Sequence, residues 1–274
     1  MPAKSPPANP MQLFDARALR RHRARAATSG GIADFLVSFA AEQLADRLAD
    51  VKRRFPVALD LGCRDGMLAR MLAGRGGIEY LVAADPAVEF ARRAPAPNLV
   101  CDAEALPFRS HAFDLVLSNL LLHWTNDLPG ALLQLRHALK PGGLLLASLF
   151  GGETLGELGG ALMEAELEQE GGASPRVSPF ADLRDLGGLL QRAGFREPVA
   201  DGDRIAVTYA DAHALMRDLR LMGESNALIE RRRGMTRRAT LARAAELYRL
   251  RHPAPDGRIA ASFQIMTLTA WAPD

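Results

Sequence analysis

Hydrophobic and polar positions follow two different periods along the chain. Up to about residue 51, apolar residues recur every three or four positions, the spacing of one helix face. This predicts a basic helix in the segment LFDARALRRHRARAA (13–27) and an amphipathic helix over 32–51. From Val57 onward, short apolar runs alternate with helical stretches. The predicted strands are 57–61, 80–84, 99–101, 114–119 and 144–150, and the predicted helices are 67–73, 87–93 and 128–139.

Strands that are apolar throughout and separated by helices indicate a parallel sheet with both faces covered. Right-handed crossovers make such a sheet doubly wound. Beyond Phe150 the pattern predicts helices at 152–169 and 181–193, then strands at 204–210 and 262–271. The sequence therefore predicts an α/β Rossmann-like fold: a mostly parallel, seven-stranded sheet with helices on both faces and a helical insertion between the last two strands. We interpret Lys140-Pro141-Gly142-Gly143 as a turn between a helix and a strand.

Composition fits one domain without a disulfide framework. Residues 1–10 are rich in Pro and small residues, which predicts a disordered tail. We divide the rest into a helical cap (11–55), a cofactor-binding core (56–151) and a segment that completes the same domain (152–274), with a lid at about 211–252. Two cysteines, no signal peptide and no apolar stretch long enough to cross a bilayer predict a cytoplasmic protein.

The strongest local motif is LDLGCRDG (59–66), in which a buried strand ends at Asp60 and a glycine-bracketed turn opens a helix. Ligands of open α/β sheets bind at the carboxyl ends of the strands, so Asp60, Gly62 and Gly66 are candidate ligand-binding residues. The alternative is a tight turn that needs glycine only for its backbone angles.

The next strand ends in Asp85, where a carboxylate can accept hydrogen bonds from both ribose hydroxyls of a nucleoside. The alternative is a helix N-cap before Pro86. The glycine spacing differs from G-x-G-x-x-G, and the carboxylates around this turn would repel a pyrophosphate. They suit a ligand with an amino group and a sulfonium, which favours S-adenosylmethionine (SAM) over NAD.

The motifs LDLGCRDG, AADPA, CDAEALPF, FDLVLSN and LKPGG occur in this order, and together they resemble those of class I SAM-dependent methyltransferases. The resemblance implies that Asp60, Gly62 and Gly66 line the methionine part of SAM and that Asp85 holds the ribose. It further implies adenine contacts from Asp102 and Ala103, and cofactor contacts from Ser118 and Asn119. Arg64 stands where that family usually has a third glycine, so its side chain must point away from the ligand or weaken binding.

A second resemblance covers roughly residues 11–271. SNLLLHWTNDLPGAL, FGGETLGEL, GGASPRVSPF and DLRLMGESNAL are similar to segments of the complex I assembly factor family, which includes a mitochondrial member implicated in arginine hydroxylation. A more distant resemblance is to the methyltransferases that act on malonyl-acyl carrier protein. The MGESN segment (222–226) favours the assembly-factor branch.

Substrate-side candidates follow the fourth and fifth strands and the lid. His123 is the candidate catalytic residue, although it could equally pack beneath the next helix, as is expected of Trp124. The remaining substrate or lid candidates are Glu153, Thr154, Arg176, Glu224, Ser225 and Asn226. Each has a plainer alternative as a turn, a helix end or a solvated charge. No metal site is expected, because the histidines show no ligand spacing with a carboxylate.

The leading functional hypothesis is a SAM-dependent methyltransferase that acts on a protein or an acyl carrier-type partner. The alternatives are arginine hydroxylation on the same scaffold and a binding factor that uses SAM structurally. The arginines at 231–243 are expected on a solvated helix, with a docking surface for an acidic protein as the second interpretation. Nucleic acid is not expected, because only 6% of the residues are aromatic and the formal net charge is +2.

Overall fold

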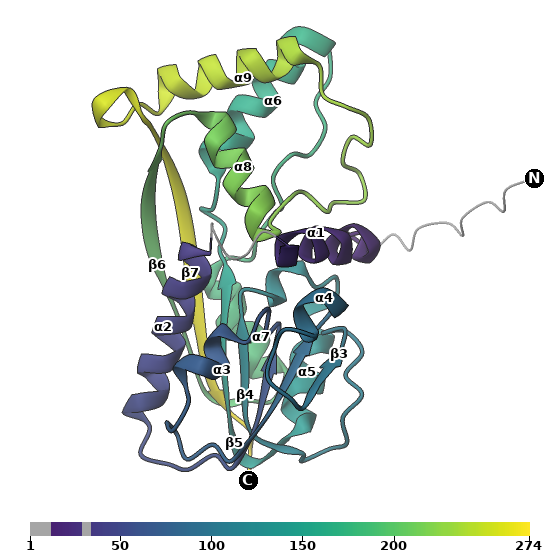
Figure 1. Ribbon diagram of the computed structural model, residues 1–274, viewed down its shortest axis with the longest axis vertical. Helices are drawn as coiled ribbons and strands as arrows, with labels where there is room; N and C mark the ends of the chain where they lie inside the picture. Colours follow the sequence, from purple (N-terminus) through teal and green to yellow (C-terminus); the bar gives the residue numbers. More distant parts are fainter. Residues whose placement is uncertain (1–11, 29–33) are drawn as a thin grey trace, which may run out of the picture.

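The computed structural model describes residues 12–28 and 34–274, so the tail predicted over 1–10 lies outside the described residues. Seven strands form one sheet in the order β3-β2-β1-β4-β5-β7-β6 (Figure 1). Strands β1 to β5 are parallel, and β7 runs antiparallel to both β5 and β6. The strand bounds are β1 Val57–Leu61, β2 Tyr80–Asp85, β3 Asn98–Val100, β4 Phe113–Asn119, β5 Leu139–Phe150, β6 Arg196–Tyr209 and β7 Ile259–Trp271.

Helices cover both faces of the sheet because successive side chains of each central strand point to opposite faces. In β4, Leu115 and Leu117 pack with α2 and α3, whereas Val116 packs with α5 and α7. The helix bounds are α1 Ala16–Thr28, α2 Phe35–Asp50, α3 Met67–Met71, α4 Val88–Ala91, α5 Leu128–Ala138, α6 Gly156–Glu170, α7 Leu183–Arg192, α8 Ala212–Met222 and α9 Arg238–Arg251. Short 3₁₀ turns lie at Leu122–Trp124 and Pro255–Gly257. The predicted fold class is confirmed.

The antiparallel pair of strands β6 and β7 extends beyond the parallel strands and contributes to a second apolar core (Figure 1). Side chains of α6, α8 and α9 pack there against Tyr209, Phe263 and Ile265. The lid predicted at about 211–252 contains α8 and α9; because α6 packs against α9, we use the name lid for α6, α8 and α9 together. The lid stands over the carboxyl ends of the parallel strands, which is where ligands bind in open α/β sheets.

Two sequence predictions of local structure are corrected. The sequence predicts a turn at 140–143, but β5 begins at Leu139, which pairs with Phe113 before a register shift. Gly142 has φ 65° there, so the segment is an irregular strand entry. The sequence predicts a strand only from 204, but β6 begins at Arg196. Its first residues pair with β7, and because most side chains of β6 are exposed, they form no apolar pattern in the sequence.

The arginine-rich stretch is less solvated than the sequence predicts. Arg231 pairs with Asp15 at 2.9 Å, Arg232 with Glu170, and Arg243 with Glu168 at 2.6 Å. Two of these partners lie on α6, so charge pairing joins α6 to α9 and to the loop before it. Three of the six arginines are thus paired within the fold, whereas Arg233, Arg237 and Arg238 are exposed, as the prediction of a solvated stretch expects.

Within the described ranges, no helix is long and apolar enough to span a membrane.

Candidate functional site

The strand order reverses between β1 and β4, and the predicted cofactor residues gather at the carboxyl ends of these strands. Gly62 and Gly66 have φ values of 85° and 81°. A Cβ on Gly62 would lie 2.8 Å from Leu121 Cβ, and one on Gly66 would lie 2.4 Å from Pro95 Cδ. Both glycines thus have a structural reason in the turn itself, because other residues rarely adopt such angles and the space is closed.

Asp60 is a buried carboxylate that contacts no counter-charge among the described residues. Its side chain is fully buried, and neither oxygen has a hydrogen-bond partner in the described part of the chain. Burial, reinforced by the charges of Asp85 and Asp65, raises the pKa of Asp60 to about 7. A cationic ligand group placed against these oxygens would supply the missing counter-charge.

Asp85, at the end of the neighbouring strand, is fully occupied by donors. Oδ1 accepts hydrogen bonds from Arg23 Nε at 3.1 Å and from the Ala87 amide at 2.9 Å. Oδ2 accepts from Arg23 Nη2 at 2.5 Å and from the Arg64 amide at 3.1 Å. Both side chains of the ion pair are buried. Asp85 is not the N-cap of α4, which is Ala87; it is the partner of an arginine on α1.

Arg64, the departure from the family's glycine, directs its side chain toward the start of α2 and the end of α8. Its guanidinium bonds Asp34 at 2.9 Å and the Met222 carbonyl at 3.0 Å, and it lies 4.8 Å from the centre of the Phe90 ring. Its backbone has φ 51°, an unusual angle for a residue with a side chain. Arg64 therefore joins the loop to the lid while its amide serves Asp85.

The predicted adenine contacts lie beside a very small cavity. Asp102 and Ala103 line it together with Phe14 and Leu19, from the N-terminal segment, and its volume is about 20 Å³. A space of this size holds about one water molecule. Asp102 Oδ1 accepts from the Glu104 amide at 3.1 Å. The region expected to receive adenine is thus covered by the N-terminal segment.

The two predicted residues at the end of β4 differ. Ser118 is fully buried, and its Oγ has no partner within the described residues. Asn119 donates to the Val37 carbonyl at 3.0 Å and accepts from Ser148 Oγ at 2.8 Å. Asn119 is committed to linking β4, β5 and α2, whereas Ser118 still has hydrogen-bonding capacity.

These residues fit one end of SAM and not the other. The unpaired oxygens of Asp60 suit an ammonium group, and the amino-acid end of SAM carries one. The ribose end does not fit as long as Arg23 occupies Asp85. The sequence did not reveal Arg23, because its basic segment gave no sign of which carboxylate it would meet.

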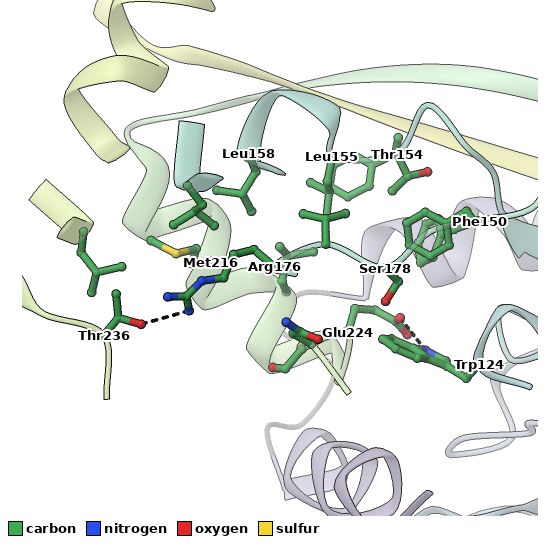
Figure 2. Close-up of a pocket in the computed structure, with 18 residues that line it drawn as sticks. Trp124, Phe150, Thr154, Leu155, Leu158, Arg176, Ser178, Met216, Glu224 and Thr236 are labelled. Atoms are coloured by element: carbon green, nitrogen blue, oxygen red, sulfur yellow. Dashed lines mark hydrogen bonds between the residues drawn. The ribbon is translucent and has the colours of Figure 1, made fainter. Parts of the chain in front are cut away.

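A second, larger pocket lies between the sheet and the lid (Figure 2). Its volume is about 260 Å³. Trp124 and Glu224 lie at one end and Thr236 at the other, with apolar side chains along the walls. The lining residues are Trp124, Phe150, Thr154, Leu155, Leu158, Leu162, Arg176, Val177, Ser178, Phe180, Met216, Leu219, Glu224, Ser225, Asn226, Thr236, Leu241 and Phe263.

Glu224 connects this pocket to the segment after β4. Its Oε2 accepts from Trp124 Nε1 at 2.9 Å and lies 3.1 Å from His123 Nε2. Burial alone would raise the pKa of Glu224, but His123, Arg64 and Arg23 outweigh burial and hold that pKa below its usual range. The pocket therefore contains an ionised carboxylate.

His123 contacts Glu224 and the strand β5 in this arrangement. Its Nδ1 accepts from the Phe150 amide at 3.5 Å, so the ring proton lies on Nε2 and points at Glu224. Neither nitrogen is left for a substrate, and His123 does not line the pocket. The candidate catalytic histidine thus contacts Glu224 and not the pocket, whereas Trp124, for which packing is the favoured interpretation and a pocket wall the alternative, lines the pocket.

All but one of the other predicted substrate or lid residues line the pocket. Arg176 binds Glu166 and Thr236, Ser225 accepts from Arg25 at 3.2 Å, and Asn226 donates to the Pro175 carbonyl at 2.8 Å. Thr154 also lines the pocket. Glu153 does not: it faces solvent and pairs with Arg204. Across the described ranges, no group of three or more His, Cys, Asp or Glu side chains could hold a metal ion.

Comparison with known proteins gives matches to one family model and to proteins of two kinds. Residues 59–147 match the model described as a methyltransferase domain. The chain is 43% identical to mouse (Mus musculus) arginine-hydroxylase NDUFAF5, mitochondrial, over 87% of this chain and 70% of that protein. It is 38% identical to the malonyl-[acyl-carrier protein] O-methyltransferase of Halorhodospira halophila, over 95% of this chain and 89% of that protein.

Solved structures share the fold at low sequence identity. The YcgJ protein of Bacillus subtilis superposes with a TM-score of 0.59 at 13% identity, covering 86% of this chain and 99% of that chain. Phosphoethanolamine N-methyltransferase 2 of Haemonchus contortus, in complex with SAM, gives a TM-score of 0.50 at 17% identity, covering 85% of this chain and 52% of that chain.

Proposed function

This chain belongs to the methyltransferase-fold enzyme family that includes arginine-hydroxylase NDUFAF5 and malonyl-[acyl-carrier protein] O-methyltransferase, and from that premise we propose that it methylates a protein or carrier-bound substrate with SAM. We take the amino-acid end of SAM to lie against Asp60 and Gly62, and its ribose to bind Asp85. The cytoplasmic location predicted from the sequence is part of the same proposal, although the NDUFAF5 relatives are named as mitochondrial proteins.

The observation that carries the proposal is the position of the lid pocket. Glu224 lines it and bonds His123 and Trp124, which follow β4 at the edge of the sheet where the cofactor residues gather. A substrate group in this pocket would therefore lie beside the cofactor. The lid covers it on the other side, which excludes water from the reacting groups.

The size of the pocket favours a group that projects from a larger partner. At about 260 Å³ it is slightly smaller than the ~300–1,000 Å³ typical of sites for whole small molecules. A protein side chain or the acyl end of a carrier-bound chain would fill it while the rest of the partner stays outside. The apolar walls would align that group, and alignment is the main requirement of a displacement reaction.

The bound cofactor would supply an electrophilic methyl group on a positively charged sulfur. The chain's own residues would position it and keep the site dry. Asp60 would neutralise the ammonium group, and Trp124 and Phe150 would form the wall against which the acceptor lies.

The direct test is an assay with isotopically labelled SAM and two purified acceptors, a malonyl-loaded acyl carrier protein and an arginine-containing peptide. The proposal expects a labelled methyl group on one of them, identified by intact-mass spectrometry. Leu158→Trp, which fills the pocket, should abolish transfer. Leu167→Trp, at an exposed position on the same helix, is the matched control and should leave transfer intact. SAM binding without any labelled product would favour a binding factor.

A second candidate function is modification of an arginine side chain by hydroxylation, the activity named for the NDUFAF5 relatives. The observation that favours it is the ionised Glu224 beside Trp124 and Phe150, because a carboxylate next to aromatic faces suits a guanidinium group. The same assay separates the two functions when it is run in air with an added two-electron donor, because inserting one atom of O₂ into the arginine side chain reduces the other atom to water. A peptide that gains one oxygen, with no label, would support hydroxylation and contradict methyl transfer.

A further inference from the structure

We propose that α1 is a latch on the cofactor site: Arg23 competes with the cofactor's ribose for Asp85, so binding requires Arg23 to leave. This inference rests on the part of the proposed function that assigns the ribose to Asp85. It adds that the closed arrangement of α1 excludes the cofactor.

The argument begins with the acceptor capacity of Asp85. A carboxylate offers about four lone-pair positions. Hydrogen bonds from Arg23 Nε, Arg23 Nη2 and the amides of Arg64 and Ala87 use all four. The two amides belong to the loop and to the start of α4, so they stay in place. The ribose hydroxyls can be accepted only where the Arg23 guanidinium now lies.

The adenine side is closed by the same segment. Phe14 and Leu19 leave a cavity of only about 20 Å³ beside Asp102 and Ala103. A planar base needs far more room than a site for about one water molecule. Ribose and adenine therefore meet the same obstacle, and one movement of α1 with the residues before it would remove it.

Contacts on both sides hold α1 in the closed position (Figure 1). Helix α1 packs against α4 on one side and α8 on the other. Phe14 packs edge-on against Trp124 with ring centres 5.3 Å apart, His22 Nδ1 lies 3.1 Å from the Ser225 carbonyl, and Arg25 donates to Ser225 Oγ at 3.2 Å.

These contacts connect the latch to the lid pocket. Trp124 and Ser225 line that pocket, and Glu224 lies between them in contact with Trp124. Displacement of α1 removes support from this wall at the same time as it frees Asp85. Cofactor entry and the shape of the substrate pocket are thereby coupled through α1.

The first test measures how the full chain binds SAM. Tryptophan fluorescence reports the latch because Trp124 contacts Phe14, whereas the second tryptophan, Trp271, packs beside Phe55 and Arg53. With a latch that must open first, the observed binding rate levels off at high SAM concentration at the opening rate. An observed binding rate that keeps rising in proportion to the SAM concentration, over the whole range in which the signal saturates, would overturn the proposal. This measurement uses the unmodified chain, so it does not depend on a variant that folds.

The second test compares Arg23→Met and Arg23→Lys with the control Arg21→Met, at an exposed position on the same helix. Calorimetry should show SAM binding tightened by about 5- to 150-fold in Arg23→Met, the usual range of a coupling between two states. Arg23→Lys should fall between that variant and the wild type, and Arg21→Met should match the wild type. Weaker binding by Arg23→Met would show that Arg23 contacts the cofactor directly and would overturn the latch.

A third test compares ligands with and without the ribose hydroxyls, to establish whether Arg23 competes with the ribose. Arg23→Met should tighten the binding of adenosine more than that of 2′,3′-dideoxyadenosine, which lacks the two hydroxyls. Equal gains would overturn the assignment, as would a failure of SAM to bind any of these proteins. The outcome is separable from methyl transfer: a chain that shows the latch but transfers no methyl group contradicts the proposed function alone. Transfer by a chain whose SAM affinity is unaffected by Arg23→Met contradicts the latch alone.

Discussion

Asp60 and Asp85 end neighbouring parallel strands, and both side chains are fully buried, yet their surroundings are opposite. Asp85 accepts four hydrogen bonds, two of them from the Arg23 guanidinium. Asp60 accepts none within the described residues. The protein has thus provided a counter-charge for one carboxylate of the site and left the other without one.

The difference shows how a cofactor site can be prepared at one end and closed at the other. A buried carboxylate without a partner destabilises the fold unless it takes up a proton or receives a cation. A buried ion pair avoids that penalty only while both partners stay in place. The site therefore gains from a cationic ligand at Asp60, whereas at Asp85 a ligand must replace an existing partner.

The largest expected effect comes from removing the partnered carboxylate. Asp85→Ala leaves the Arg23 charge buried and unpaired, which should lower the free energy of unfolding by about 3–5 kcal/mol. Urea denaturation measures this change. Asp65→Ala, which breaks an exposed pair with Arg70, is the control and should cost less than about 1 kcal/mol. The double variant Asp85→Ala/Arg23→Met should recover most of the loss. Strictly additive losses would contradict the pairing.

The unpartnered carboxylate of Asp60 should make the free energy of unfolding depend on pH. Because the folded-state pKa of Asp60 is raised from 3.8 to about 7, the folded protein binds more protons than the unfolded chain between these values. Stability contributed by this group is therefore present at low pH and lost as pH rises from about 4 to about 7, by roughly 4 kcal/mol. Denaturation across this range should give a steeper decline for the wild type than for Asp60→Asn. Parallel curves would show that Asp60 titrates normally.

Much of the sheet could be predicted because its signal is local. The five parallel strands are short, uniformly apolar runs, and each run identifies its strand to within a few residues, except at the entry to β5. The glycine turn after Asp60 is equally visible, since positive φ angles and close packing restrict Gly62 and Gly66 to glycine. Only the second half of β6 can be recognised, because an exposed edge strand has no apolar pattern to reveal it.

The pairings of the site could not be read from the sequence, because they join residues far apart along the chain. Arg23 and Asp85 are separated by 62 positions, and His123 and Glu224 by 101. Which arginine of a basic helix meets which acid depends on how that helix packs on the finished fold. The sequence therefore placed both carboxylates on neighbouring strands, where they lie in the structure, but did not indicate that Arg23 contacts Asp85.

A smaller effect should separate the two carboxylates in binding experiments. SAM brings an ammonium group to Asp60, which favours the ionised carboxylate, so binding below about pH 7 should release a proton. Affinity should then rise by up to about tenfold per pH unit until pH 7 and level off above it. Calorimetry in two buffers of different ionisation enthalpy measures the released proton. In Asp60→Asn both the slope and the proton release should disappear; their persistence would assign them to another group.

The smallest effect on SAM affinity is expected at Arg64, whose amide donates to Asp85 while its side chain pairs with Asp34. Arg64→Gly keeps the amide that bonds Asp85 and relieves the backbone at φ 51°, while it removes the contacts with Asp34 and the Met222 carbonyl. The backbone relief offsets only part of the loss, because both side chains of the pair with Asp34 are largely buried, so the free energy of unfolding should fall by about 2 kcal/mol. SAM affinity should stay the same or increase, as measured by calorimetry at constant pH. A clear loss of affinity would place the Arg64 guanidinium on the ligand, and the amino-acid end of the site would then be held by an arginine as well as by Asp60.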